Sequence, residues 1–179
     1  MLAELLRQKH DIILNKWFEL TIETYPADTS KFLKNQKDQF QNPVGHTVRK
    51  ETKALFDALL EGAEPEALAA TIDNLVRIRV VQEISAAQGV AFVFLLKSAV
   101  RETLAADLSD NALLQELLEF ESRIDGLALA VFDHYVDCIE KIYEIRAREH
   151  RMRSAKLVEQ VNKLYGGLED PGLVKDKDA

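Results

Sequence analysis

The chain has little of what stabilises small secreted proteins or crosses membranes. Its 179 residues include one cysteine, Cys138, so an internal disulfide is impossible and a reducing compartment is the simplest setting. The longest apolar run, residues 90–96, is far shorter than the roughly 18 residues of a membrane span. Charged residues interrupt the start of the chain, where a secretory signal needs an unbroken apolar stretch. These absences predict a cytoplasmic protein without a membrane partner.

Glycine, proline and positive charge are also scarce. Seven glycines and four prolines are too few for a fold rich in strands and turns, so helices are favoured. The formal net charge of −7 repels phosphate and argues against a nucleic-acid partner. A basic stretch at residues 146–156 has no interleaved aromatic side chains, which is more typical of a solvated helix face than of a nucleic-acid site.

The residue patterns of common catalytic sites are missing. None of the four histidines has a glutamate three residues before it, as a di-iron helical bundle requires. The spacing of His134 with Asp133 or Asp137 is more often that of surface partners than of a metal site. No G-x-S-x-G motif or phosphate-binding glycine loop occurs, and Cys138 on an apolar helix face is expected to be inert. We therefore expect no catalytic residue, metal or cofactor.

Apolar spacing of three and four residues, with start and stop signals, predicts an all-α fold. Asn42 and Pro43 form a helix start, Gly62 a helix stop, and Ser85 with Gln88 a capping box. The stretch 27–41 is predicted to be a loop with at most one helical turn, begun by Thr29 or Ser30. The helix after the capping box is the most apolar, and Val93 and Phe94 should be its most buried residues. Helices are expected over residues 2–24, 43–61, 65–84, 86–108 and 110–152.

The last of these helices, capped by Ser109 or Asp110, is too long for one compact domain. At about 1.5 Å per residue it spans roughly 60 Å, so its end should extend from the core. A second apolar row widens its face, formed by Leu114, Leu118, Ala128, Phe132 and Ile139. A near-heptad seam that continues beyond the core favours a homodimer, with an interface formed by Tyr135, Cys138, Ile142 and Ile145. A short amphipathic segment at residues 157–164 follows, and the tail after Gly166 and Gly167 is expected to be disordered.

Two arginines lie two residues apart in an apolar helix, so they point to different faces. At least one of Arg77 and Arg79 is therefore predicted to point inward. A buried guanidinium needs a partner, for which Asp125 is a candidate. The alternative is a pair of local contacts at four-residue spacing, Asp73 with Arg77 and Arg79 with Glu83. The sequence leaves both readings open.

Several short stretches together resemble the RsbRD N-terminal domain family, which is related to the sensory domains of RsbR-type stressosome proteins. The matching segments are Trp17, residues 42–45, 77–82, 88–90, 96–97, 123–125 and 135–146. The resemblance covers roughly residues 1–150 and implies a globin-like fold without haem that dimerises and passes a signal along its last helix. Relatives often continue into a STAS domain, and since this sequence has only a short tail there, the output is expected to go to a separate protein partner.

The resemblance leads to a functional prediction. Residues 1–150 are expected to form a globin-like, non-enzymatic sensory domain, and residues 151–179 a helical extension and disordered tail. The alternative is a globin-like sensor that binds haem or another cofactor. Residues 65–84 contain no histidine, cysteine, methionine or tyrosine that could serve as a proximal haem ligand, which favours the first reading.

Overall fold

A computed structural model describes residues 1–36, 38, 40–81, 85–108 and 111–165. In these residues the chain is helical and contains no strand, so the predicted all-α class is confirmed, as is the long C-terminal helix. The predicted cap at Ser109 or Asp110 and the tail from Gly166 lie outside the described residues. The chain divides into two units, Met1–Ile139 and Glu140–Ala179.

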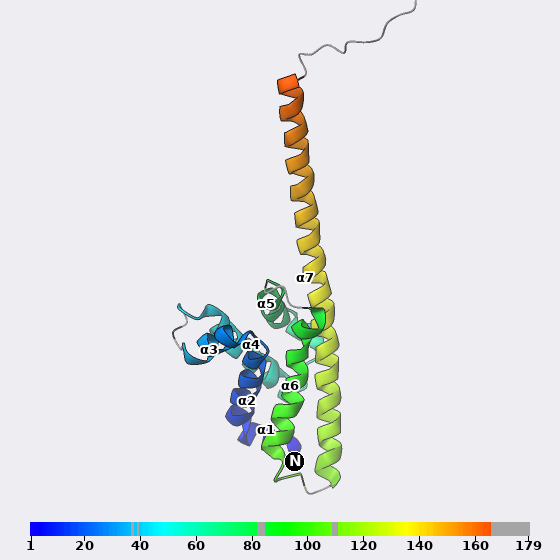
Figure 1. Cartoon of the computed structure of the whole chain (residues 1–179). Helices are drawn as coiled ribbons and strands as arrows, with labels where there is room; N and C mark the ends of the chain where they lie inside the picture. The colour runs from blue at the N-terminus through cyan, green and yellow to red at the C-terminus, as the bar shows by residue number, and fades with distance from the viewer. Residues whose placement is uncertain (37, 39, 82–84, 109–110, 166–179) are drawn as a thin grey trace, which may run out of the picture. The chain divides into compact units, whose positions relative to one another are not determined.

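Seven α-helices and one 3₁₀ helix make up the described part of the chain (Figure 1). In order they are α1 (Leu2–Gln8), α2 (His10–Glu23), α3 (Ala27–Asn35), α4 (Pro43–Glu61), η1 (Pro65–Leu68), α5 (Ala69–Val80), α6 (Ala86–Leu104) and α7 (Asn111–Tyr165).

The first predicted helix, residues 2–24, is two helices. The backbone breaks from helical geometry at Lys9, which has φ −100° and ψ 14°. The Lys9 ammonium group donates to the Thr103 carbonyl oxygen at 3.3 Å and pairs with Asp107, so it joins the α1–α2 junction to the end of α6. This long-range contact could not be predicted from the apolar pattern, which continues across the break.

The predicted loop at residues 27–41 was wrong in its first half, because α3 occupies Ala27–Asn35. Pro26 takes an extended conformation as the N-cap, and Asp28 places a negative charge in the first turn, where it interacts favourably with the helix dipole. Only Leu33 is buried in this helix. A single buried side chain leaves too weak a period for sequence analysis to detect.

The predicted start and stop signals of α4 and α6 are confirmed. The Asn42 side chain accepts a hydrogen bond from the Gly45 N–H at 2.8 Å, and α4 ends at Gly62 in the left-handed region with φ 74°. Both halves of the capping box between Ser85 and Gln88 are formed. These residues specify helix ends through local chemistry alone, which is why the sequence predicts them well.

Other helix boundaries differ from the predictions. The predicted helix at 65–84 is η1 followed by α5, which ends at Val80, and residues 82–84 lie outside the described part. Helix α6 ends at Leu104, where the carbonyl oxygen accepts from the amides of Asp107 and Leu108 in a closing turn. The segment 157–164 is not separate, because α7 continues to Tyr165 without a glycine or proline to end it.

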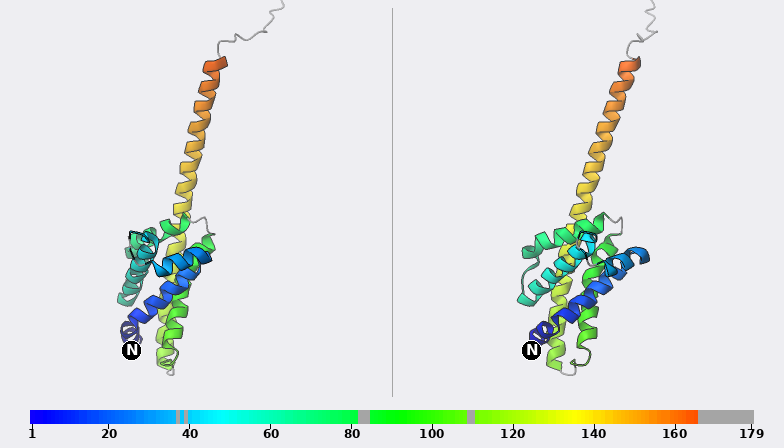
Figure 2. Two further views of the ribbon diagram at one scale, coloured as in Figure 1. Left: turned by 60° about the vertical axis from the view of Figure 1, so that its left-hand side comes forward. Right: turned by 90° about the vertical axis from the view of Figure 1, so that its left-hand side faces the viewer.

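The core of the first unit is built on α2, α6 and the first part of α7, with α6 and α7 running side by side in opposite directions (Figures 1 and 2). The Trp17 indole on α2 is fully buried and donates to the Phe92 carbonyl oxygen on α6 at 2.7 Å. Phe56 on α4 packs edge-on against Phe120 on α7, with ring centroids 6.4 Å apart. Val93 is buried as predicted, but Phe94 is 47% exposed, because it lies on the outer face of α6.

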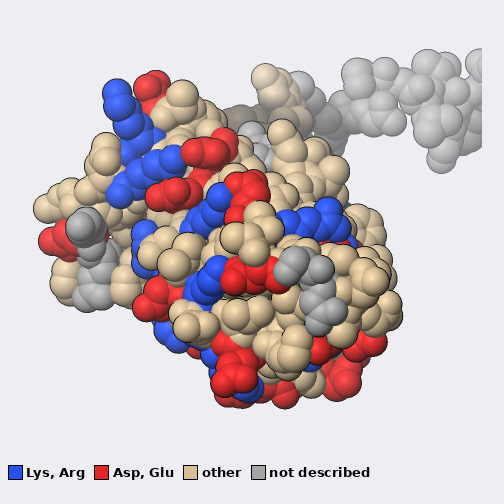
Figure 3. Space-filling model, turned by 90° about the horizontal axis from the view of Figure 1, so that it is seen from below, with Lys and Arg blue, Asp and Glu red and all other residues tan. Residues whose placement is uncertain are grey.

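The charged surface of this unit is mixed in sign. At the end of the unit seen in Figure 3, lysine and arginine side chains lie next to aspartate and glutamate. On this face, neighbouring charges of opposite sign partly cancel each other's field.

Candidate interaction surface

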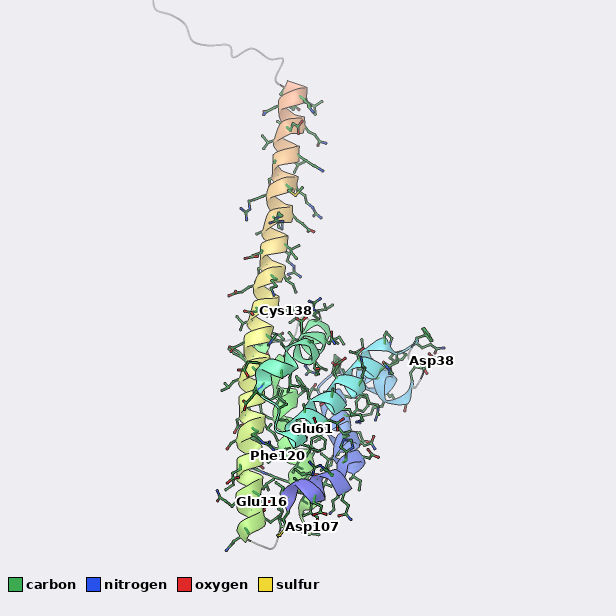
Figure 4. All side chains as sticks on the ribbon, turned by 180° about the vertical axis from the view of Figure 1, so that it is seen from behind. Asp38, Glu61, Asp107, Glu116, Phe120 and Cys138 are labelled. Carbon is green, nitrogen blue, oxygen red and sulfur yellow. The ribbon has the colours of Figure 1, made fainter. Side chains whose placement is uncertain are left out.

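Helix α7 carries two rows of apolar side chains within residues 111–139. One row is buried against the rest of the unit and consists of Leu113, Leu117, Phe120, Ile124, Leu127, Val131 and Tyr135. Glu116, Phe120 and Cys138 follow one another along this helix in Figure 4. The first row therefore belongs to the core of a single chain and is not available to a partner.

Tyr135 was predicted at the dimer interface, and the structure places it in the core instead. Its side chain is 1% exposed. Its ring lies so close to Gly89 of α6 that a Cβ atom there would be 2.2 Å from a ring carbon. Burial raises the pKa of the Tyr135 phenol, and the nearby Arg79 guanidinium partly opposes that change. The glycine on α6 makes room for the tyrosine, a relation that spacing within one helix cannot reveal.

Most of the second row on α7 faces outward, although its Ala128 is buried in the core. Four large apolar side chains remain exposed on it, namely Leu114, Leu118, Leu129 and Phe132. Phe94 on the neighbouring α6 is exposed as well. We call these five residues the α6–α7 apolar face. The sequence identified three of them as part of a wider stripe but could not tell which row would be buried.

Two ion pairs link α6 to α7. Arg101 donates to both carboxylate oxygens of the buried Glu121, each at 2.6 Å, and this contact raises the pKa of Arg101. Lys97 pairs with Asp125 at 2.6 Å. Asp125 therefore has a lysine partner on the surface, and the predicted pair of Asp125 with Arg79 is wrong.

Arg79 is buried, at 2% exposed, but its hydrogen-bond partners are neutral. Its guanidinium group donates to the Thr24 hydroxyl and the Gln88 carbonyl oxygen, each at 3.1 Å, and to the Tyr25 hydroxyl at 3.4 Å. Its Nε has no hydrogen-bond partner among the residues that the structure describes. Burial lowers the pKa of Arg79. The contacts join the ends of α2 and α5 to the start of α6, so this side chain acts as a structural link.

Arg77 adopts the first of the two local pairings that the sequence left open, whereas Glu83, the local partner considered for Arg79, lies outside the described residues. Its Nε donates to Asp73 one helical turn earlier, at 2.8 Å, and both side chains are on the surface. The two arginines therefore have different roles, as their spacing of two residues requires.

Beyond residue 139, the described part of α7 has few buried side chains. Cys138, at the end of the first unit, and Ile142 in the second are partly exposed, and every residue from 143 to 165 is exposed. In sequence, Tyr143, His150, Leu157 and Leu164 recur every seven residues, and Ala147, Ser154 and Val161 repeat at the same interval four residues later. This is the spacing of positions that meet in a two-stranded coiled coil.

In the described ranges, no group of three or more His, Cys, Asp and Glu side chains is arranged to hold a metal ion. Within the same part of the chain, no helix is long and apolar enough to cross a membrane.

The described part of the chain is all-helical and carries exposed apolar side chains on α6 and α7. Residues 11–150 match the family described as the RsbT co-antagonist protein rsbRD N-terminal domain, and the chain belongs to that family. The match confirms the resemblance inferred from the sequence and points to a regulatory domain. No curated protein and no solved structure matches the chain.

Proposed function

We propose that the chain is a non-enzymatic sensory module of the stressosome type, acting in the cytoplasm as a homodimer and passing its signal to a protein partner. The family match over residues 11–150 carries this proposal. In it, residues 1–150 form the globin-like sensory domain without haem, and residues 151–179 form the helical extension and tail. Nucleic acids and membranes are not partners, in keeping with the net charge of −7.

The exposed apolar residues of α7 support a dimer. Tyr143, Leu157, Val161 and Leu164 are all exposed in the single chain and follow the heptad spacing. A two-fold pair of helices would bury the same side chains on both copies, which removes apolar surface from water. We therefore assign the dimer contact to the row that these residues form with the other positions at the same spacing. This heptad row consists of Tyr143, Ala147, His150, Ser154, Leu157, Val161 and Leu164.

The sequence-based interface remains as a rival assignment. With Tyr135 buried in the core, it consists of Cys138, Ile142 and Ile145. Continued at the same spacing, this row reaches Glu149 and Lys156, which are unfavourable in the centre of a coiled coil. The heptad row stays apolar or small over the same length, apart from His150.

Sedimentation equilibrium of the whole chain tests whether the chain dimerises and which row of α7 forms the contact. The wild-type mass is expected to be twice 20.3 kDa. Leu157→Glu with Leu164→Glu should shift the mass to that of a monomer, whereas Ile142→Glu with Ile145→Glu should leave the dimer in place. The reverse pattern would return the contact to the rival face, and a wild-type monomer at high concentration would exclude the homodimer.

The signalling role is tested by partner capture from the source cell. Tagged wild-type chain and the Leu157→Glu, Leu164→Glu variant are compared with Arg77→Gln, which changes an exposed arginine elsewhere on the surface. We expect a stoichiometric protein partner that Arg77→Gln retains and the heptad-row variant loses. Recovery of no protein above background with the wild-type chain would argue against signalling through protein contacts.

A further inference from the structure

We propose that a cleft between α2, α3 and α4 binds a small organic carboxylate through Arg49. This inference deepens the proposed sensory function, on which it rests for its purpose, by assigning the class of molecule that would be sensed. Helices α2, α3 and α4 lie next to one another in the first unit (Figures 1 and 2). The cleft is therefore formed within one unit, by residues close in sequence.

The size and charge of the cleft fit a small anion. Its volume is about 450 Å³, inside the range of about 300–1,000 Å³ that is usual for small-molecule sites. Among the described residues that line it are Lys34, His46 and Arg49 and no carboxylate. The whole chain has a net charge of −7, so this local composition is opposite to the average. A cleft lined by one sign of charge concentrates ligands of the other sign.

Arg49 is held in place by two contacts. Its Nη1 donates to the Asn15 side-chain oxygen at 2.8 Å, and its guanidinium carbon lies 3.9 Å from the centroid of the Phe18 ring. No carboxylate in the described ranges pairs with this guanidinium group. A stacked guanidinium keeps its N–H edge available, and that edge matches a carboxylate in a two-bond contact.

The other lining residues distinguish the carboxylate site from a general basic patch. Lys34 is paired with Glu23 at 2.8 Å, so its charge is partly compensated and Arg49 is the main anchor. The start of α4 is not the anchor, because the Asn42 side chain already accepts the Gly45 N–H. Phe18 and Leu33 add apolar surface to the cleft. That surface favours an organic acid with an apolar body over inorganic phosphate.

Binding is tested on the full-length, isotope-labelled chain by nuclear magnetic resonance titration. The probes are benzoate, its neutral analogue benzamide, and inorganic phosphate. Benzoate is expected to shift the amide signals of Gly45 and His46 and the Nε signal of Arg49, and to saturate. Benzamide and phosphate should bind at least about tenfold more weakly, because the first lacks the charge and the second lacks the apolar body.

Matched variants assign the effect to Arg49. Arg49→Gln should weaken benzoate binding by about tenfold or more, since it removes the charge-assisted contact. Arg77→Gln removes the same charge from another exposed helix position and should bind as the wild type does. Arg49→Lys keeps the charge without the planar fork and should be intermediate. It also serves as the test variant if circular dichroism shows that Arg49→Gln does not fold.

The proposal is overturned if benzoate does not saturate, if benzamide binds equally well, or if phosphate binds more tightly than benzoate. It is also overturned if Arg49→Gln and Arg77→Gln weaken binding equally, since that would indicate general charge attraction. Failure here leaves the sedimentation and capture experiments unaffected. A missing carboxylate site is thus distinguishable from a missing dimer or partner.

Discussion

Arg79 shows how a buried cation can be accommodated when none of its described hydrogen-bond partners is a carboxylate. Its guanidinium group is surrounded by a hydroxyl from Thr24, a carbonyl from Gln88 and the rings of Tyr25 and Phe92, with its carbon 4.9 Å from the Phe92 centroid. Hydrogen bonds and ring faces offset part of the cost of removing the charge from water. Because part of this cost remains, we expect the volume of the Arg79 side chain to contribute more to the free energy of unfolding than its charge does.

Substitutions at Arg79 should separate volume from charge. Arg79→Ala removes a large buried side chain and is expected to lower the free energy of unfolding by about 3–5 kcal/mol. Arg79→Met keeps most of the volume without the desolvated charge, and it should stay within about 1 kcal/mol of the wild type. The Thr24 hydroxyl retains its bond to the Thr21 carbonyl oxygen in both variants. Denaturant unfolding measures the two values.

Asp125→Ala tests whether Asp125 compensates the buried charge of Arg79. Because Asp125 is half exposed and paired with Lys97 on the surface, its loss should cost less than about 1 kcal/mol. A cost of about 3–5 kcal/mol would instead indicate that Asp125 compensates a buried charge. Equal losses for Arg79→Met and Arg79→Ala would show that the charge of Arg79, and not its volume, is required.

At the scale of the helices, Gly89 controls how closely α6 approaches α7. A methyl group at Gly89 would lie within 2.2 Å of the Tyr135 ring, whereas a methyl group at Gly126 on α7 would meet nothing within 4 Å. Gly89→Ala should therefore destabilise the fold by about 1–3 kcal/mol through overpacking. Gly126→Ala should stabilise it by about 0.5–1 kcal/mol, because alanine favours the helix interior.

Thermal and denaturant unfolding of these two variants give a matched comparison, since both make the same chemical change inside a helix. A second comparison checks the cause. Tyr135→Leu in the Gly89→Ala background should recover part of the lost stability by making room for the methyl group. If Gly89→Ala is as stable as Gly126→Ala, the close packing of α6 on α7 at this point is incorrect.

Local signals were predictable from sequence, and contacts between helices were not. The ends of α4 and the start of α6 depend on Asn42, Gly62 and Ser85, which act on their own neighbours. The break at Lys9 depends on Thr103 and Asp107, which lie 94 and 98 positions later in the sequence. The burial of Tyr135 depends on Gly89 of another helix, and neither relation is visible to periodicity. The same holds for the candidate interaction surface. The sequence predicts the long helix α7, but it does not show which of the two apolar rows is buried in the core and which is exposed.

At the scale of the whole molecule, the helical segment in the second unit lacks the packing that normally stabilises a helix. Every described residue from 143 to 165 is exposed in the single chain, so this part of α7 has no buried apolar face of its own. Most of the stability of helices in proteins comes from tertiary packing of an amphipathic face rather than from helix propensity. Glu144, Arg146, Arg148 and Glu149 add charge but little apolar contact. The persistence of this helical segment should therefore depend on a second copy.

Hydrogen exchange at two concentrations tests that dependence. At a concentration where sedimentation reports a dimer, peptides from residues 140–165 should be protected. On dilution to the monomer they should exchange much faster, because the unpaired helix opens frequently. Peptides from the buried row at residues 113–135 should stay protected at both concentrations, since their packing lies within one unit. Leu157→Glu with Leu164→Glu should give the diluted pattern at every concentration. If residues 140–165 are equally protected in monomer and dimer, the segment is stable by itself, and dimerisation through the heptad row does not contribute to its folding.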